Sequence, residues 1–440
     1  MAILKILSKN TIEITLQIIS PMTMFMLGVL FIMFLILIAP VNFLYLGTPY
    51  SWIYLELCII FLLLGITTGM KGILIKSTPI TISINAMTLK QIFYLGIFLA
   101  SFGAILRIID RYYIRGASIS KNVFENREIV SETGINFFSV LSSFFYPVIL
   151  LLPFLYLLLY QARIHSFRHT FILSLLALFY ITDSILFGSR SILMIWMFLI
   201  LLYLYVFNIL KFKVTKNSLT LFFILSILFF IANGYMFDHR TSLMGMEAYE
   251  STQISVYAYF LPLDDFYVSL LESNKGNLFY FFILGIVNFI QYMVHGLFEL
   301  FYLVDNFDTD NMLLGEQNFA VVIKFIYKIF QIPFSFTDNA EVLVRTGIYN
   351  TLFGPLYYDF GWGATVFSLI LGLMIGFISK KALSGDLFLL PLQLYFLLLL
   401  FFALIVDTII FAQGIYNMVA FSIFYFLSKF LFIPKRRYTL

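Results

Sequence analysis

The sequence predicts an all-α polytopic membrane protein with about ten transmembrane helices and one large, partly helical outer loop. Hydrophobic residues make up 62% of the 440 residues, charged residues make up 11%, and the mean hydropathy is +0.98. Soluble domains do not have this composition. The apolar runs reach the length of about 20 residues that a helix needs to cross a bilayer core. Because lipid cannot satisfy backbone polar groups, we expect these runs to be helices.

The apolar runs are continuous and do not alternate with polar residues, which excludes the strands of a transmembrane barrel. The first run follows Lys5 and Lys9 without a small-residue cleavage pattern, so we expect a retained helix and not a removed signal peptide. The single cysteine, Cys58, leaves neither an internal disulfide nor a cysteine-based metal site. The predicted spans lie at about 18–38, 51–69, 91–109, 139–160, 170–187, 191–208, 219–236, 361–379, 387–406 and 414–432.

Positive charge is concentrated on one side of these spans. The only acids in the same segments are Glu13 and Asp386. The positive-inside rule therefore predicts that both termini are cytoplasmic and that the number of spans is even. The basic residues of the inner segments are Lys5, Lys9, Lys71, Lys76, Lys90, Arg163, Arg168, Lys211, Lys213, Lys216, Lys380, Lys381, Lys435, Arg436 and Arg437.

The charge pattern divides the chain into three parts. Residues 1–236 form an N-terminal membrane domain of about seven helices with an outer loop at 110–138. Residues 237–360 form the large outer loop, and residues 361–440 contribute the last helices and a basic cytoplasmic tail. Loops of this length are functional or disordered. The many Phe and Tyr residues of the large loop argue against disorder.

Two segments of the large loop are predicted to be helices at the membrane surface. Residues 278–304 are apolar enough to cross, but a single crossing would put one terminus on the wrong side. We therefore expect this segment to lie at the interface or to enter and return. Asn288, Gln291, His295 and Glu299 follow one another at spacings of three, four and four residues and share one helix face, as expected beside a wet cavity or a surface. Residues 319–330 form a second, shorter amphipathic segment.

Several outer segments together resemble the O-antigen polymerases, the Wzy-type oligosaccharide repeat-unit polymerases. The segments are 188–191 (GSRS) in a short outer turn, 238–242 (DHRTS) at the start of the large loop, and 349–363 (YNTLFGPLYYDFGWG) at its end. Residues 110–116 (DRYYIRG), followed by 126–128 (NRE), resemble the first outer loop of these proteins. The general plan extends over the whole chain.

The resemblance implies a GT-C-like membrane glycosyltransferase of the bacterial inner membrane with its active face in the periplasm. Such an enzyme joins undecaprenyl-diphosphate-linked oligosaccharide units, which serve as donor and acceptor, into a polysaccharide. A chain-length regulator and a flippase in the same membrane are the implied partners, and no nucleic-acid partner is expected. O-antigen ligases share this plan and remain an alternative. A lipid-linked oligosaccharide flippase is a further alternative, although flippases have more spans, shorter loops and an internal repeat.

Arginine suits the chemistry that such an enzyme must perform. Loss of a lipid diphosphate builds negative charge on phosphate oxygens, and guanidinium groups bind these oxygens in pairs. No DxD-type acid cluster occurs at a suitable place, so we expect neither a metal nor another cofactor. Arg190 and Arg240 are the predicted catalytic arginines. The alternatives are an interfacial Arg190 that reaches lipid headgroups and an Arg240 that is an ordinary charge at a helix end.

The acceptor hydroxyl needs a base, and two candidates remain open. His295 has a suitable reference pKa of about 6.5. Asp359 either acts as the base or caps the helix that begins near Gly361. For Arg127, which lies in the first outer loop, a solvated loop face is the favoured interpretation. The predicted substrate-binding residues are Arg115, Asp238, His239, Glu299, Arg345, Tyr349, Asn350 and Tyr357, although aromatic residues are also common at membrane interfaces without any ligand.

Overall fold

Long apolar helices make up most of the molecule. The structure, a computed structural model, describes residues 11–17, 19–71, 80–121, 123–132, 136–187, 189–209, 216–243, 245–330, 337, 342–410 and 413–432. It is 75% helical with little sheet, which confirms the predicted all-α membrane class. In this described part, seven helices are long and apolar enough to cross a membrane, and three shorter apolar helices accompany them.

The predicted spans fall on helical residues, although the span at 139–160 comprises α6, a 3-10 segment (Tyr146–Leu151) and α7. The first half of the chain forms α2 (Pro21–Leu37), α3 (Pro49–Gly69), α4 (Ala86–Ile108), α5 (Val123–Glu132), α6 (Phe137–Phe145), α7 (Leu152–Gln161), α8 (Phe167–Leu186) and α9 (Arg190–Val206). The second half forms α10 (Lys216–Ser242), α11 (Ala248–Ile254), α12 (Asp265–Ser273), α13 (Leu278–Asn306), α14 (Ala320–Phe330), α16 (Phe353–Phe360), α17 (Ala364–Leu383), α18 (Leu390–Phe402) and α19 (Gly414–Phe432).

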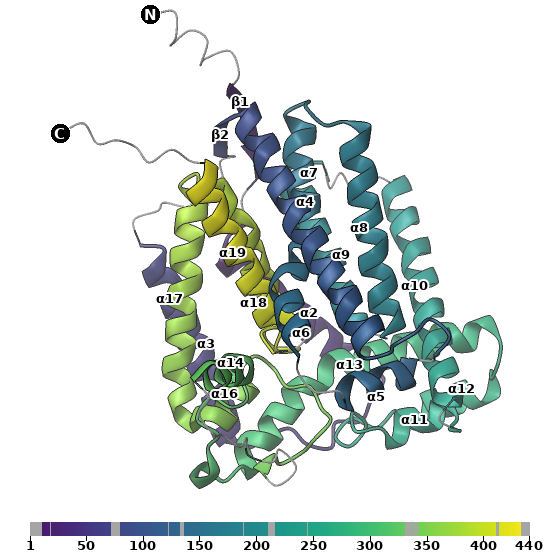
Figure 1. The fold of residues 1–440 in the computed structure, drawn as a ribbon. Coiled ribbons are helices and arrows are strands. Elements are labelled where there is room, and N and C mark those ends of the chain that lie inside the picture. The colour runs from purple at the N-terminus through teal and green to yellow at the C-terminus, as the bar shows by residue number, and fades with distance from the viewer. Residues whose placement is uncertain are drawn as a thin grey trace, which may run out of the picture.

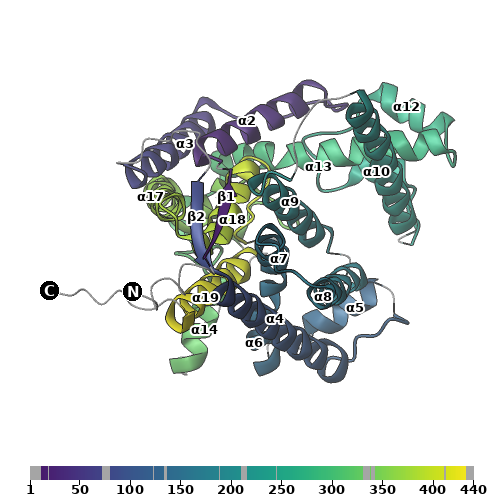
Figure 2. The same ribbon diagram turned by 90° about the horizontal axis from the view of Figure 1, so that it is seen from above.

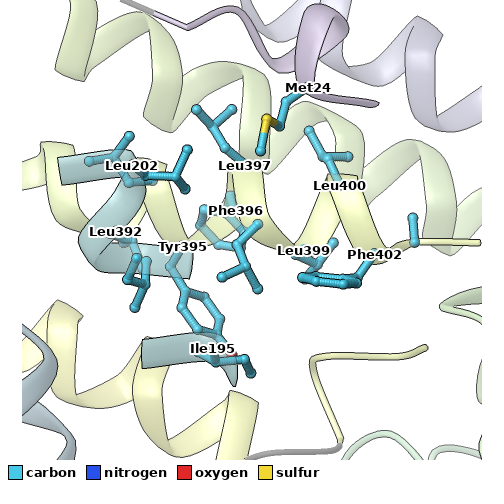
Figure 3. Packing of buried hydrophobic residues seen from close by; sticks show 14 of the residues in the cluster. Met24, Ile195, Leu202, Leu392, Tyr395, Phe396, Leu397, Leu399, Leu400 and Phe402 are labelled. Carbon is cyan, nitrogen blue, oxygen red and sulfur yellow. The ribbon is translucent and has the colours of Figure 1, made fainter. Parts of the chain in front are cut away.

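The short helix α18 lies at the centre of the bundle. Nearly every one of its side chains is buried, as expected for a helix that is apolar on all sides. Its residues contact Met24 of α2 and Ile195 and Leu202 of α9, as Figure 3 shows. Tyr395 points into the same cluster and donates a hydrogen bond of 3.1 Å to the carbonyl oxygen of Thr408. The chain directly after α18, residues 403–408, is buried as well.

Glycines allow the closest helix contacts. Gly65 and Gly69 of α3 face Gly372 and Gly376 of α17, and a Cβ on any of the four would collide with backbone of the opposite helix. Small residues four apart bring helices together in lipid, where van der Waals packing replaces the hydrophobic effect. The α3–α17 pair is therefore the most intimate helix contact of the bundle.

A pair of short strands was not predicted from the sequence. Strand β1 (Thr11–Leu16) precedes α2, and β2 (Ile80–Asn85) lies between α3 and α4. They pair antiparallel, with Thr11 opposite Asn85 and Leu16 opposite Ile80. The strands and the end of α19 lie at one end of the bundle, whereas α5, α11, α12, α14 and α16 lie at the other (Figure 1).

Helix α13 decides between the two expectations for residues 278–304. It is one continuous helix of 29 residues, so the expectation that this segment enters and returns is wrong. Unbroken backbone hydrogen bonding leaves no turn inside it. Figure 1 shows α17 along its length and Figure 2 shows it end-on, whereas α13 is seen lengthwise in both. Helix α13 thus lies across the bundle, under the ends of the upright helices.

Candidate functional site

The segments singled out by their sequence meet at the end of the bundle that carries α5, α11 and α13. The turn at 188–191 follows α8, residues 238–242 end α10, and Tyr349 lies in the segment before α16. The short helix α5 links them. Its Arg127 donates a hydrogen bond to Phe187, just before the first segment, and the charge of Arg240 and the hydroxyl of Tyr349 affect its pKa. The sequence had favoured a solvated loop face for this arginine.

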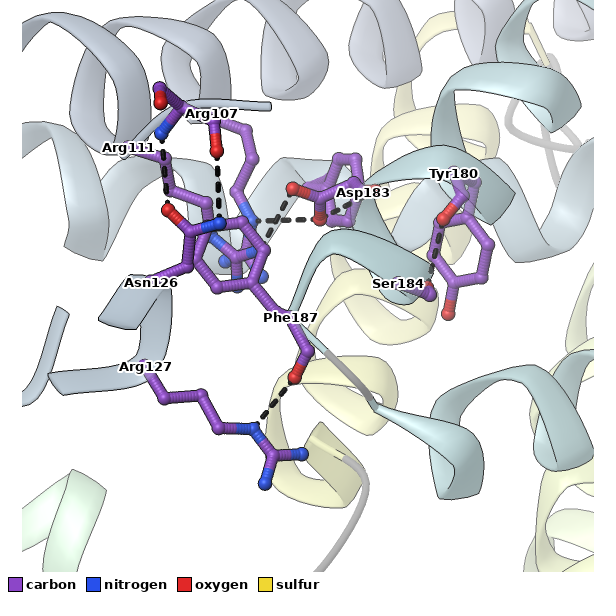
Figure 4. A network of polar contacts seen from close by, with 10 residues as sticks. Arg107, Arg111, Asn126, Arg127, Tyr180, Asp183, Ser184 and Phe187 are labelled. Atoms are coloured by element: carbon purple, nitrogen blue, oxygen red, sulfur yellow. Dashed lines mark hydrogen bonds and ion pairs between the residues drawn. The ribbon is translucent and has the colours of Figure 1, made fainter. Parts of the chain in front are cut away.

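Arg127 binds the end of α8. Its Nε donates a hydrogen bond of 2.8 Å to the carbonyl oxygen of Phe187, the residue that caps α8 (Figure 4). The guanidinium carbon of Arg111 lies 3.7 Å from the centre of the Phe187 ring. One residue at the entrance of the 188–191 turn is therefore held by two arginines. Arg190 begins α9, but its side chain lies outside the described residues.

Arg240 lies beside Arg127. Its guanidinium carbon is 5.7 Å from the ring of Phe124, which precedes Arg127 by nearly one turn of α5. Burial lowers the pKa of Arg127, the positive charge of Arg240 lowers it further, and the Tyr349 hydroxyl acts in the opposite direction. Within the described part of the chain, Arg240 forms neither a hydrogen bond nor an ion pair. We call Arg127 and Arg240 the cationic cluster.

The position of α5 depends on Arg115, which the sequence had suggested as a substrate ligand. Arg115 is buried, and its Nε donates to a carboxylate oxygen of Asp110 at 2.9 Å. A second nitrogen donates to the carbonyl oxygen of Val130 in α5 at 2.6 Å. Asn126 accepts from and donates to the backbone of Ser118 at 3.1 and 3.0 Å. These bonds fasten α5 to the end of α4.

A buried ion network lies behind the cationic cluster and was missed by the sequence analysis. Asp183 of α8 accepts from Arg111 at 2.7 Å, from Arg107 at 3.5 Å and from the Tyr146 hydroxyl at 3.1 Å. All four side chains are largely buried, and Figure 4 shows the two arginines converging on Asp183. Asp183 interrupts an apolar helix, which was the available sequence signal. Arg111 belongs to the π-helical turn Ile109–Ile114 that ends α4.

His295 lies in a group of tyrosines. Its ring centre is 4.4 Å from that of Tyr257, 5.7 Å from Tyr292 and 6.4 Å from Tyr349. The Nδ1 atom lies 2.7 Å from the carbonyl oxygen of Tyr292. Because a carbonyl only accepts, Nδ1 carries the proton and the neutral ring has its lone pair on Nε2. We call these four residues the histidine cluster.

The second ring nitrogen of His295, Nε2, is buried and has no hydrogen-bond partner among the described residues. The sequence had expected His295 and Glu299 on one face of a helix, and the structure places both, buried, on α13. Tyr349 contacts the histidine ring and also influences Arg127. Its hydroxyl favours the charged form of Arg127, and its ring belongs to the histidine cluster.

Glu299 and Arg345 form a buried ion pair one helical turn from His295. Arg345 donates to Oε1 of Glu299 at 2.9 Å and to the carbonyl oxygen of Val256 at 2.7 Å. Its guanidinium carbon lies 4.2 Å from the Tyr259 ring centre. The other carboxylate oxygen, Oε2, is buried without a partner in the part of the chain that is described. Two residues predicted as substrate ligands are thus held together, with one acceptor atom unused.

Asn350 and Asp407 add two more unused acceptors, and the sequence analysis missed Asp407. The segment after α18 returns along residues 350–352: the Asp407 amide donates to the Asn350 carbonyl at 2.9 Å, and the Leu352 amide donates to the Ala403 carbonyl at 2.8 Å. Asn350 Oδ1 and Asp407 Oδ2 are both buried without a partner in the described ranges. Gly296 packs directly on the Ile405 carbonyl, so this segment also touches α13.

Two other predicted site residues, Asp359 and Tyr357, form contacts within the fold. Asp359 lies inside α16 and not at the start of the following helix; its carboxylate accepts from the Gln317 and Asn318 amides at 2.9 and 2.8 Å and from the Asn318 side chain at 2.6 Å. Tyr357 is buried against Tyr54, with ring centres 4.7 Å apart. Asp359 therefore anchors the loop before α14, and Tyr357 belongs to the core.

The remaining two residues flank Arg240. Asp238 accepts a hydrogen bond of 2.9 Å from the Tyr280 hydroxyl of α13. His239 is exposed, and its ring stacks on Tyr235 with centres 6.4 Å apart. Asp238 thus joins α10 to α13, and His239 points away from the bundle core.

Comparisons with known proteins returned nothing: no family model, no curated protein and no solved structure matches the chain. Within the residues that the structure describes, no group of three or more His, Cys, Asp and Glu side chains is arranged to hold a metal ion. The site must therefore be interpreted from its own geometry.

Proposed function

We propose that the protein is an O-antigen polymerase that joins undecaprenyl-diphosphate-linked oligosaccharide units at the periplasmic face of the bacterial inner membrane. The observation that carries the proposal is the position of Arg240. Its guanidinium forms neither a hydrogen bond nor an ion pair with the described residues, and its positive charge acts on the guanidinium of Arg127. At the same end of the bundle, His295 has a buried Nε2 without a hydrogen-bond partner among the described residues. This arrangement suits an anionic leaving group and a hydroxyl nucleophile. The motif resemblance supports the same reaction.

The proposed reaction assigns a role to each cluster. An acceptor hydroxyl attacks the anomeric carbon of the donor sugar, and His295 Nε2 takes the hydroxyl proton. The bond between the anomeric carbon and the diphosphate oxygen breaks, and its electron pair stays on the diphosphate. Arg240 and Arg127 stabilise the new charge through paired N–H donors. We assign the base to His295 and not to Asp359, because the Asp359 carboxylate already accepts three hydrogen bonds.

The orientation in the membrane follows from this proposal. In this proposal the end with α5, α11 and α13 faces the periplasm, and the strands β1 and β2 and the end of α19 lie at the opposite, cytoplasmic end (Figure 1). The basic inner segments support that direction. The ten-span count and the GT-C-like architecture belong to the same proposal. A chain-length regulator and a flippase are its proposed partners.

Surface lipopolysaccharide from a deletion strain of the source organism, analysed by gel with and without this gene, tests the proposal. A polymerase deletion leaves one repeat unit on the lipid A core and removes the ladder. A ladder restored by the wild-type gene but not by Arg240→Ala supports the proposed mechanism. An unchanged ladder in the deletion strain overturns the proposal. Single lipid-linked units trapped at the inner face of the membrane indicate a flippase.

An O-antigen ligase is the second candidate, and His295 favours it. Ligases of this plan use outer arginine and histidine residues, and His295 is a buried outer histidine with a defined basic nitrogen. The same gel separates the two functions. A ligase deletion leaves the core without any unit while long lipid-linked polymer accumulates.

A further inference from the structure

The central helix α18 has an aspartate near each of its ends. Asp386 precedes the helix, and its carboxylate forms an ion pair with Lys429 at 2.9 Å and accepts from the Tyr425 hydroxyl at 2.9 Å. Asp407 follows the helix and is fully buried. Asp386 thus has a positive partner, whereas Asp407 has none in the part of the chain that is described.

The surroundings of Asp407 disfavour a lone negative charge. The Ile405 and Val406 amides both donate to the Phe402 carbonyl, which keeps this segment close to the C-terminal end of α18. That end of a helix carries the negative pole of the helix dipole. A buried carboxylate without a counter-charge is costly, and the dipole adds to the cost.

The turn that carries Asp407 is covered by the rest of the protein, although turns between helices usually lie in water. Its residues 403–408 are all buried. Gly296 of α13 packs on the Ile405 carbonyl, and the Asp407 amide donates to the Asn350 carbonyl at 2.9 Å. Helix α13 and the segment before α16 therefore separate this turn from solvent.

Three side-chain oxygens in this covered region have no hydrogen-bond partner among the described residues. They are Oδ2 of Asp407, Oγ1 of Thr408 and Oδ1 of Asn350, whose residues are 0%, 2% and 6% exposed. Their positions are fixed by other bonds: Asp407 Oδ1 accepts from the Ile409 amide at 2.7 Å, and the Thr408 carbonyl accepts from the Tyr395 hydroxyl at 3.1 Å. The region thus offers buried oxygen ligands and one uncompensated negative charge.

We propose that Asp407, Thr408 and Asn350 hold a buried monovalent cation of the size of Na⁺. One positive charge balances the carboxylate, and hard cations take oxygen ligands. Non-helical chain at the C-terminal end of a short helix inside a membrane protein favours such an ion. A divalent ion fits less well, because no group of three or more His, Cys, Asp and Glu side chains in the described residues is arranged to hold a metal.

The cation joins two parts of the molecule. Asp407 and Thr408 belong to the turn after α18, whereas Asn350 follows Tyr349, a member of the histidine cluster. The ion therefore holds the segment before α16 against the end of α18. This inference does not depend on the proposed function, since binding of Na⁺ to the purified protein involves no glycan.

Radioactive sodium measures the site directly. The full chain is purified in dodecyl maltoside in choline chloride, and binding is followed at constant ionic strength and pH. We expect saturable binding of one Na⁺ per chain. We also expect the thermal unfolding midpoint to rise as Na⁺ replaces choline, because a ligand of the folded state stabilises it.

Two variants locate the cation, and one is the matched control. Asp407→Asn removes the charge and should weaken Na⁺ binding at least tenfold. Thr408→Val keeps the shape of the side chain, removes one ligand oxygen and should weaken binding less. Asp386→Asn, at the other end of α18, removes an acid that already has Lys429 as its partner and should leave Na⁺ binding unchanged.

Each other outcome overturns the site. Wild-type protein without saturable Na⁺ binding, and with equal midpoints in Na⁺ and choline, has no such cation. A midpoint that depends on pH but not on Na⁺ means that a proton neutralises Asp407 instead. Undiminished binding in both Asp407→Asn and Thr408→Val places the cation elsewhere. If Asp407→Asn does not fold, the wild-type titration and Thr408→Val still decide.

Discussion

Two groups of arginines, both near the end of α8, differ in what faces them. Arg107 and Arg111 share the carboxylate of Asp183 and are buried. Arg240 has no carboxylate partner in the described residues; it lies over the ring of Phe124, and its charge lowers the pKa of Arg127. Charge in a membrane protein is costly in both cases; Arg107 and Arg111 have a carboxylate counter-ion, whereas Arg240 has none among the described residues. The difference teaches that pairing, and not residue type, distinguishes a structural arginine from one that is proposed to bind an anionic ligand.

The largest expected effect comes from removing the counter-ion. Asp183→Ala leaves two buried guanidiniums unpaired and is expected to destabilise the fold by about 3–5 kcal/mol. The measurement is the thermal unfolding midpoint of the purified protein in detergent. Phe171→Ala, at an exposed position of the same helix, is the control and should change the midpoint little. An unchanged midpoint in Asp183→Ala would show that the network does not stabilise the fold.

Arg240→Ala should leave stability unchanged but abolish activity. Its thermal midpoint stays close to wild type, because no ion pair is lost, while polymer formation falls by about 100-fold or more, as when one preorganised donor is removed. Arg240→Lys should rescue poorly if paired phosphate contacts matter. The ladder on a lipopolysaccharide gel measures this, with membrane level checked by immunoblot. Full activity in Arg240→Ala would remove the arginine mechanism.

His295→Gln tests whether the cationic cluster works together with a base. Loss of a general base costs about 100-fold or more in rate. We expect the ladder to be lost while a benzophenone-bearing farnesyl diphosphate still crosslinks to the protein, since the arginines remain. Tyr292→Phe is a useful control, because only its backbone carbonyl bonds the Nδ1 atom. Loss of labelling in His295→Gln would contradict the separation of binding from proton transfer.

The smallest effect is expected at Arg115. Arg115→Lys keeps a charge beside Asp110 but loses the second bond, to the Val130 carbonyl, and should cost about 1 kcal/mol of stability. The ladder should keep its length distribution. A selective loss of polymer, with the thermal midpoint unchanged, would instead support the substrate-binding role that the sequence predicted for Arg115.

The sequence predicted the helices well, because the bilayer restricts which residues and backbone structures a membrane segment can have. Apolar runs and a skewed distribution of lysines and arginines are enough to predict the helices, because a bilayer allows little else. The spacing of Gln291, His295 and Glu299 correctly placed His295 and Glu299 on one helix. The strands β1 and β2 escaped notice because each has only six residues and their pairing joins positions far apart in the chain.

The sequence could not predict which side chains would bond to residues in distant segments. Nothing local says that Asp359 accepts from residues 317 and 318, or that Arg127 reaches the carbonyl of Phe187, because these contacts join separate segments. Asp183 and Asp407 did carry a signal, since each is an acid within an apolar stretch. Intramembrane acids are therefore the sequence feature that would most have improved the predicted site.

The β1–β2 pair also constrains the order in which the protein assembles. Residue 11 leaves the ribosome long before residue 85, its partner. At about 5–20 residues per second, several seconds pass between the synthesis of β1 and that of β2, and α2 and α3 are made in between. The strands can pair only after the chain that contains these two helices has folded back on itself. The small sheet therefore closes only once α2 and α3 have been made.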